Sequence, residues 1–141
     1  MGDRRSKVSG GITLTRRQVR RLGGVMGICI SLALFSAGWL AQALFGSTLT
    51  NGVWFVLTMI AFPVMPILGI PATGGNSRIL LAVIVSLVLW WFLGQIAALK
   101  ASSRPIVGWR EWTKEFLFFA TGITAGTIGG LLLAAYFLGV L

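Results

Sequence analysis

Long apolar stretches with no charge dominate the pattern of the chain. No charged side chain occurs in residues 22–77, 79–99 or 116–141. Because a charge at the centre of a membrane helix costs roughly 2.5–3.5 kcal/mol on insertion scales, this pattern indicates that the chain lies in a lipid bilayer. The stretches are continuously apolar rather than alternating, so they predict helices and not a transmembrane barrel. The expected fold class is all-α, a polytopic helical membrane bundle.

The pattern predicts about four membrane segments in a single membrane domain, residues 15–141. The segments are expected at about 22–45, 53–72, 79–99 and 116–141. The polar residues 1–14 have no apolar period to bury, and we expect a disordered basic tail. Thr15 followed by Gln18 fits a capping box, which predicts a helix start near Thr15.

An interfacial loop is expected at residues 101–115, where aromatic and charged side chains are mixed. Trp109 and Trp112 lie among these charges. Tryptophan is enriched at the level of the lipid headgroups, so both side chains are expected to contact that zone.

Two prolines interrupt the second segment. Pro63 and Pro66 each lack the backbone N–H that a continuous helix needs, so they predict a kink or two half-helices. The segment is long enough to cross the bilayer, which favours four crossings. A segment that dips in and returns would instead place every basic residue except Arg78 on the side of the N-terminus, in agreement with the positive-inside tendency. Such a backbone must be buried in protein, and a small chain has little bulk to bury it. Both topologies stay open.

The net charge of +9 resides largely in the residues before the first apolar segment. Four arginines directly precede that segment: Arg16, Arg17, Arg20 and Arg21. We expect them to fix the topology and to contact anionic lipid headgroups. Membrane lipids are therefore the expected partner of this tail, and no nucleic acid is expected. The expected location is the cell inner (plasma) membrane, with a cytoplasmic N-terminus.

The side chains that carry most enzyme chemistry are scarce. The sequence has no histidine, one cysteine and three acids, Asp3, Glu111 and Glu115. These counts exclude histidine-ligated haem, His/Cys zinc sites and Ser-His-Asp catalysis within the chain. Glu111 and Glu115 lie one helical turn apart beside Arg110 and Lys114, where surface ion pairs are the simplest interpretation. We therefore expect no catalytic residue, no metal site and no cofactor, and the protein is not expected to be an enzyme.

A glycine zipper marks the last segment. Its members are spaced by four residues, Gly122, Gly126, Gly130 and Ala134. Each glycine costs an aqueous helix about 0.8–1 kcal/mol relative to alanine, and close approach of another helix offsets this cost in lipid. The partner can be a helix of this chain, a second copy or a foreign subunit, and the spacing does not choose among them.

The first segment carries a similar small-residue face at Gly23, Gly27 and Ser31. The first and last segments are therefore expected to be neighbours. A stripe of small residues on the third segment is interrupted by Trp90, which is expected to fill a packing gap or to line a cavity.

The small size of the chain, its few side chains suited to catalysis and its several packing faces favour a non-catalytic subunit or assembly factor of a larger membrane complex, of the energy-converting or transport kind. Other membrane subunits are then the expected partners. The alternative is a homo-oligomeric small pore or passive transporter, in which half-helix ends at Pro63 and Pro66 line the path.

Overall fold

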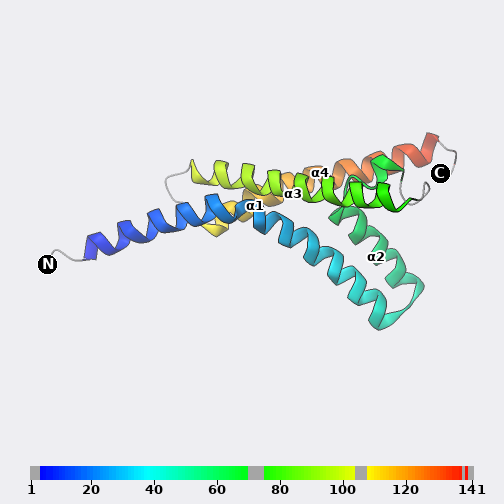
Figure 1. Cartoon of the computed structure of the whole chain (residues 1–141), viewed down its shortest axis with the longest axis horizontal. Coiled ribbons are helices and arrows are strands. Elements are labelled where there is room, and N and C mark those ends of the chain that lie inside the picture. The colour runs from blue at the N-terminus through cyan, green and yellow to red at the C-terminus, as the bar shows by residue number, and fades with distance from the viewer. Residues whose placement is uncertain (1–3, 70–74, 104–107, 138, 140–141) are drawn as a thin grey trace.

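The protein is entirely helical where its computed structural model describes it, namely residues 4–69, 75–103, 108–137 and 139. Four α-helices and one short 3-10 helix follow each other along the chain (Figure 1). Their bounds are α1 Arg4–Phe45, α2 Thr48–Ala61, η1 Pro66–Leu68, α3 Asn76–Ser102 and α4 Trp109–Phe137. The predicted all-α class agrees with this architecture.

Three of these helices are long and apolar enough to cross a membrane, rather than the four segments expected. They are residues 15–45 of α1, all of α3 and all of α4. The only α-helix in the second predicted segment is α2, whose 14 residues extend about 21 Å, short of the ~30 Å hydrocarbon core. Its start is fixed by Ser47, which forms a capping box with Thr50, and its end at Ala61 lies just before Pro63.

Two other boundaries differ from those expected. α1 begins at Arg4, well before the predicted start at Thr15, and no proline interrupts it; residues 1–3 lie outside the described part. The expected loop 101–115 is largely helical, because α4 already begins at Trp109 and carries Glu111 in its first turn. An acid at that position stabilises a helix start through the helix dipole.

α1 and α3 pack antiparallel. A guanidinium N–H of Arg16 donates to the carbonyl of Ser102 over 2.7 Å, and further along Gly27 lies against Trp90. α4 runs along α3 in the opposite direction (Figure 1). The basic part of α1, the end of α3 and the start of α4 therefore share one end of the molecule. The segment containing α2 and η1 leaves and returns at the other end.

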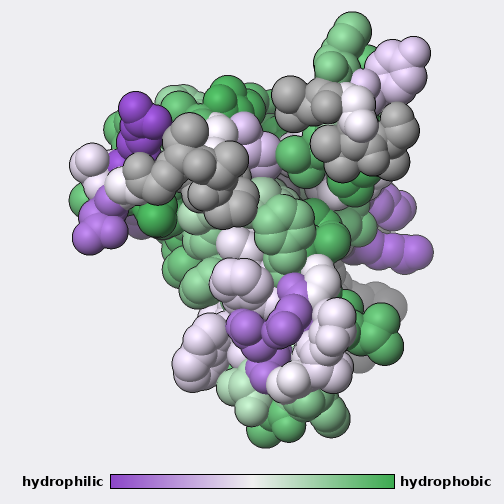
Figure 2. Space-filling model, turned by 90° about the vertical axis from the view of Figure 1, so that its right-hand side faces the viewer, coloured by the Kyte–Doolittle hydropathy of each residue, from purple (hydrophilic) through white to green (hydrophobic). Residues whose placement is uncertain are grey.

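The interior consists of two clusters. One joins α1, α3 and the start of α4 around Trp90 and Trp112, and the other joins the end of α2 to α3 around Phe62 and Ala82. Most other large apolar side chains are exposed, as a lipid-facing surface requires. Figure 2 views the end bearing the α1–α2 turn and shows hydrophobic surface over the bundle, with polar residues gathered at that turn.

Candidate functional site

The break after α2 is the most unusual backbone in the molecule. Proline at 63 and at 66 supplies no N–H, so the α-helical hydrogen bonding stops at Phe62, whose amide is the last to bond back into α2. A single 3-10 turn, η1, follows and ends at Gly69 in the left-handed conformation with φ of 73°. Glycine adopts this conformation without a Cβ penalty. The sequence prediction of a break at Pro63 and Pro66 therefore agrees with the course of the backbone.

Side chains from α1 and α3 satisfy the polar backbone that the break exposes. The carbonyl of Ala61 accepts two hydrogen bonds, one from the Ser31 hydroxyl and one from the Trp90 indole N–H, each over 2.8 Å. The Val64 amide donates to the Ser86 hydroxyl over 3.3 Å. Both serines are fully buried. Irregular backbone inside a bilayer would require this kind of cover, and α1 and α3 provide it here.

Trp90 thus has a role that spacing along α3 did not reveal. Its side chain is 1% exposed, and besides filling space it supplies one of the two donors to Ala61. A buried tryptophan usually finds a partner for its N–H, and this rule is the signal that points from Trp90 to a freed carbonyl. Ser86 also does more than fill space, because its hydroxyl accepts from the Val64 amide.

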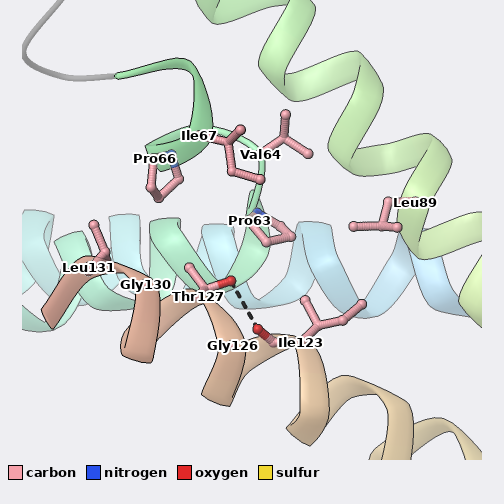
Figure 3. A pocket seen from close by; sticks show the side chains of 10 residues that line it. All are labelled: Pro63, Val64, Pro66, Ile67, Leu89, Ile123, Gly126, Thr127, Gly130 and Leu131. Carbon is pink, nitrogen blue, oxygen red and sulfur yellow. Dashed lines mark hydrogen bonds between the residues drawn. The ribbon is translucent and has the colours of Figure 1, made fainter. Parts of the chain in front are cut away.

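An apolar groove of about 510 Å³ separates the break from α4. Figure 3 shows Pro63 and Pro66 directed toward α4, with Thr127 beside them on the facing helix. The Thr127 hydroxyl donates to the carbonyl of Ile123 in its own helix over 2.9 Å. The residues lining the groove are Pro63, Val64, Pro66, Ile67, Leu89, Ile123, Gly126, Thr127, Gly130 and Leu131. With no titratable side chain among them, the groove is suited to holding apolar groups rather than to acid–base chemistry.

Among the described residues, the zipper glycines of α4 have no close neighbour. A Cβ built on Gly122, Gly126 or Gly130 would meet no atom within 4 Å, and all three residues are exposed. Ala134, the fourth residue of the row, belongs to α4, and its side chain lies outside the described part.

The small-residue face of α1 is in tight contact, although with α3 and not with α4 as its main partner. A Cβ on Gly23 would lie 2.6 Å from the Cβ of Ala98, and one on Gly27 would overlap the Trp90 carbonyl. Gly94 of α3 completes this contact, since a Cβ there would overlap the backbone of Gly23. The expected proximity of the first and last spans is limited to the region of Gly23, whose Cβ position lies 3.1 Å from the indole nitrogen of Trp112, because α3 and not α4 lies along the rest of this face.

The residues expected at the lipid headgroups divide into two groups. Arg16, Arg17, Arg20 and Arg21 are exposed and surround a surface hollow near the start of the apolar part of α1. Trp109 is half-buried.

Trp112 lies in the core instead. It is 2% exposed, stacks on Phe116 with ring centroids 4.8 Å apart, and donates from its indole N–H to the carbonyl of Gly94 over 3.1 Å. Its ring therefore contacts protein at the junction of α3 and α4, where headgroup contact was expected.

A salt bridge links α3 to α4 near this junction. Lys100 Nζ lies 2.8 Å from a carboxylate oxygen of Glu115, whose side chain is 7% exposed. The ammonium also lies 5.4 Å from the ring centre of Phe119. The prediction of surface pairs within one helix does not describe Glu115, because a partner across the loop cannot be identified from helical spacing.

No group of three His, Cys, Asp or Glu side chains with the proximity to hold a metal ion occurs in the described part of the chain. Comparison with protein-family models, curated proteins and solved structures gave no match. We therefore infer the function from the geometry of the groove and of the α4 surface.

Proposed function

We propose that the protein is a non-catalytic integral membrane subunit, or assembly factor, that joins a larger membrane protein complex through α4. The observation that carries this proposal is the uncovered zipper face of α4, where Gly122, Gly126 and Gly130 have open space beside them. Glycine in a membrane helix allows the backbones of two helices to approach closely, so an uncovered row is suited to a further helix.

The unequal burial of the three candidate spans supports this role. Of the most apolar window of each span, 6% is buried for α4, against 22% for α1 and 28% for α3. α1 and α3 already use their small residues on each other, whereas α4 contacts the rest mainly through its first turns and the groove wall. α4 is therefore the helix with most surface available to a partner.

The arrangement of the basic residues supports a topology with three crossings and a re-entrant α2–η1 segment. Arg16 bonds to Ser102, so the arginines of α1 share an end with Lys100 and Lys114, while Arg78 starts α3 at the other end. The positive-inside tendency then favours a cytoplasmic location for the first end and for the N-terminus. The satisfied backbone at Ala61 and Val64 removes the main objection to a re-entrant segment.

Purification from native membranes tests the proposed role. The tagged protein is extracted into native nanodiscs from its own host, and the mass of the intact particle and every co-purifying chain are determined. We expect foreign membrane subunits in fixed stoichiometry. Particles that contain only this chain would contradict the role of a subunit in a larger complex.

The same experiment with Gly126→Leu tests whether the foreign subunits bind the zipper face of α4. The leucine side chain would occupy the open space on the zipper face, so we expect the foreign subunits to be lost. Gly52→Leu is the matched control, because Gly52 is also a helical glycine with no atom within 4 Å of its Cβ position, and it lies on α2.

The alternative of a homo-oligomeric pore lacks a specific supporting observation. A path along the break would depend on free backbone dipoles, as in discontinuous transporter helices. The Ala61 carbonyl and the Val64 amide are instead bonded to Ser31, Trp90 and Ser86.

A further inference from the structure

A second hollow continues the groove along α4. It has a volume of about 680 Å³, is bounded by Leu93 of α3, and extends along α4 from Lys114 to Ala125. Both hollows share Ile123. We call the combined depression, from Lys114 to Leu131, the α4 trough. At the rise of an α-helix it is about 26 Å long, close to the ~30 Å thickness of the hydrocarbon core.

We propose that the α4 trough binds one transmembrane helix of a different protein, which carries small residues along one face and a carboxylate at the level of Lys114. This inference rests on the proposed subunit role and names the chemistry of the partner. Three observations carry it: the length of the trough, its glycine floor, and the charge at one end.

The length and the floor favour a helix over a lipid chain. Gly122, Gly126 and Gly130 follow the four-residue ridge along which helices interlock. Lipid tails fill a hollow equally well beside leucine, whereas a helix gains close backbone contact only beside small residues. The Thr127 hydroxyl is bonded within α4, so the middle of the trough offers an apolar surface.

The charge at the end of the trough favours an acidic group on the partner. Lys114 is exposed and lines the hollow, and among described residues no carboxylate lies within salt-bridge distance of it. A helix in the trough would displace water from this ammonium, and an uncompensated charge at such a contact opposes binding. A carboxylate of the partner helix at the same level would form an ion pair with Lys114 and thereby favour binding.

A second copy of the chain does not meet this requirement. Copies inserted in the same direction would bring Lys114 of one α4 beside Lys114 of the other. Of the two carboxylates in this part of α4, Glu115 already pairs with Lys100, and Glu111 is half-buried. The partner helix is therefore expected to differ in sequence from α4.

A designed transmembrane peptide is the probe for this inference. It is a leucine–alanine helix of about 22 residues with glycine at every fourth position and one glutamate at one end, long enough to span the bilayer. Energy transfer between this peptide and the full-length protein is measured in phosphatidylcholine nanodiscs. We expect saturable binding that Gly126→Leu weakens about tenfold or more and that Gly52→Leu leaves unchanged.

The charge requirement is tested in the same nanodiscs. Replacing the peptide glutamate by glutamine, or Lys114→Gln in the protein, is expected to weaken binding about threefold. Lys114→Glu combined with a lysine peptide is expected to restore it, which a purely structural effect of the substitution would not do.

Three results would overturn the inference: no saturable binding, binding that is indifferent to Gly126→Leu or to charge, and energy transfer between two differently labelled copies of the protein that Gly126→Leu abolishes. Foreign subunits that co-purify equally with wild type and Gly126→Leu would leave the subunit role intact and remove the trough as its surface. Failure of the two proposals is thereby distinguishable.

Discussion

At the scale of single residues, two glycines with the same helical setting have opposite surroundings. A Cβ on Gly27 would overlap the carbonyl of Trp90, whereas one on Gly52 would meet no atom of the described residues within 4 Å. We expect Gly27→Ala to lower the free energy of unfolding by about 1–3 kcal/mol, because backbone cannot move aside cheaply. Gly52→Ala should be neutral or stabilising by up to about 1 kcal/mol through helix propensity. Denaturant titration in mixed micelles measures both; equal effects would contradict the close α1–α3 contact.

The doubly bonded carbonyl of Ala61 leads to a second residue-scale prediction. Ser31→Ala and Trp90→Phe each remove one donor and leave the other in place. Each is expected to cost about 1 kcal/mol for its hydrogen bond, with an added packing loss for Trp90→Phe. The double variant leaves the carbonyl without either donor, so its cost should exceed the sum of the two by roughly 0.5–3 kcal/mol. Strict additivity in this cycle would mean that the two donors do not share one acceptor.

At the scale of the elements, the sequence predicts where helices form better than it predicts which ones touch. Apolar length predicted four segments, of which three are long enough to cross a membrane, and Pro63 and Pro66 located the break in the other one. Glycine spacing on α1 identified a packing face but not its partner, because a small-residue row describes one surface and α3 and α4 both carry such rows. The burial of Trp112 could not be predicted from the sequence either, because its indole N–H donates to a carbonyl on another helix.

An ion pair whose two side chains differ in exposure links α3 to α4 at their junction. Lys100 is 51% exposed and Glu115 is 7% exposed. Glu115→Gln leaves an ammonium that water reaches, so its cost is expected to be small, within about 1 kcal/mol. Lys100→Met leaves a buried carboxylate without that ammonium and should cost more, about 1–3 kcal/mol. The same denaturant titration measures the two variants; a larger loss for Glu115→Gln would contradict the burial of the carboxylate.

At the scale of the whole molecule, the side of the membrane reached by each turn decides between the two topologies. In a three-crossing arrangement with a re-entrant segment, the α1–α2 turn and the start of α3 lie on one side and the α3–α4 loop lies on the other. Four crossings would separate the α1–α2 turn from the start of α3. The antiparallel contact of α1 with α3 and the bond from Arg16 to Ser102 favour the first arrangement.

Cysteine labelling in sealed vesicles measures this directly. In a Cys29→Ala background, single cysteines replace Leu49 in the α1–α2 turn region, Ser77 at the start of α3 and Ser103 after its end, all exposed positions. With a membrane-impermeant maleimide, Leu49→Cys and Ser77→Cys are expected to react from the same side and Ser103→Cys from the opposite side. A label at the N-terminus should share the side of Ser103→Cys, since α1 and α3 run antiparallel. Reaction of Leu49→Cys and Ser77→Cys from opposite sides would establish that the broken segment crosses the bilayer despite the shortness of α2.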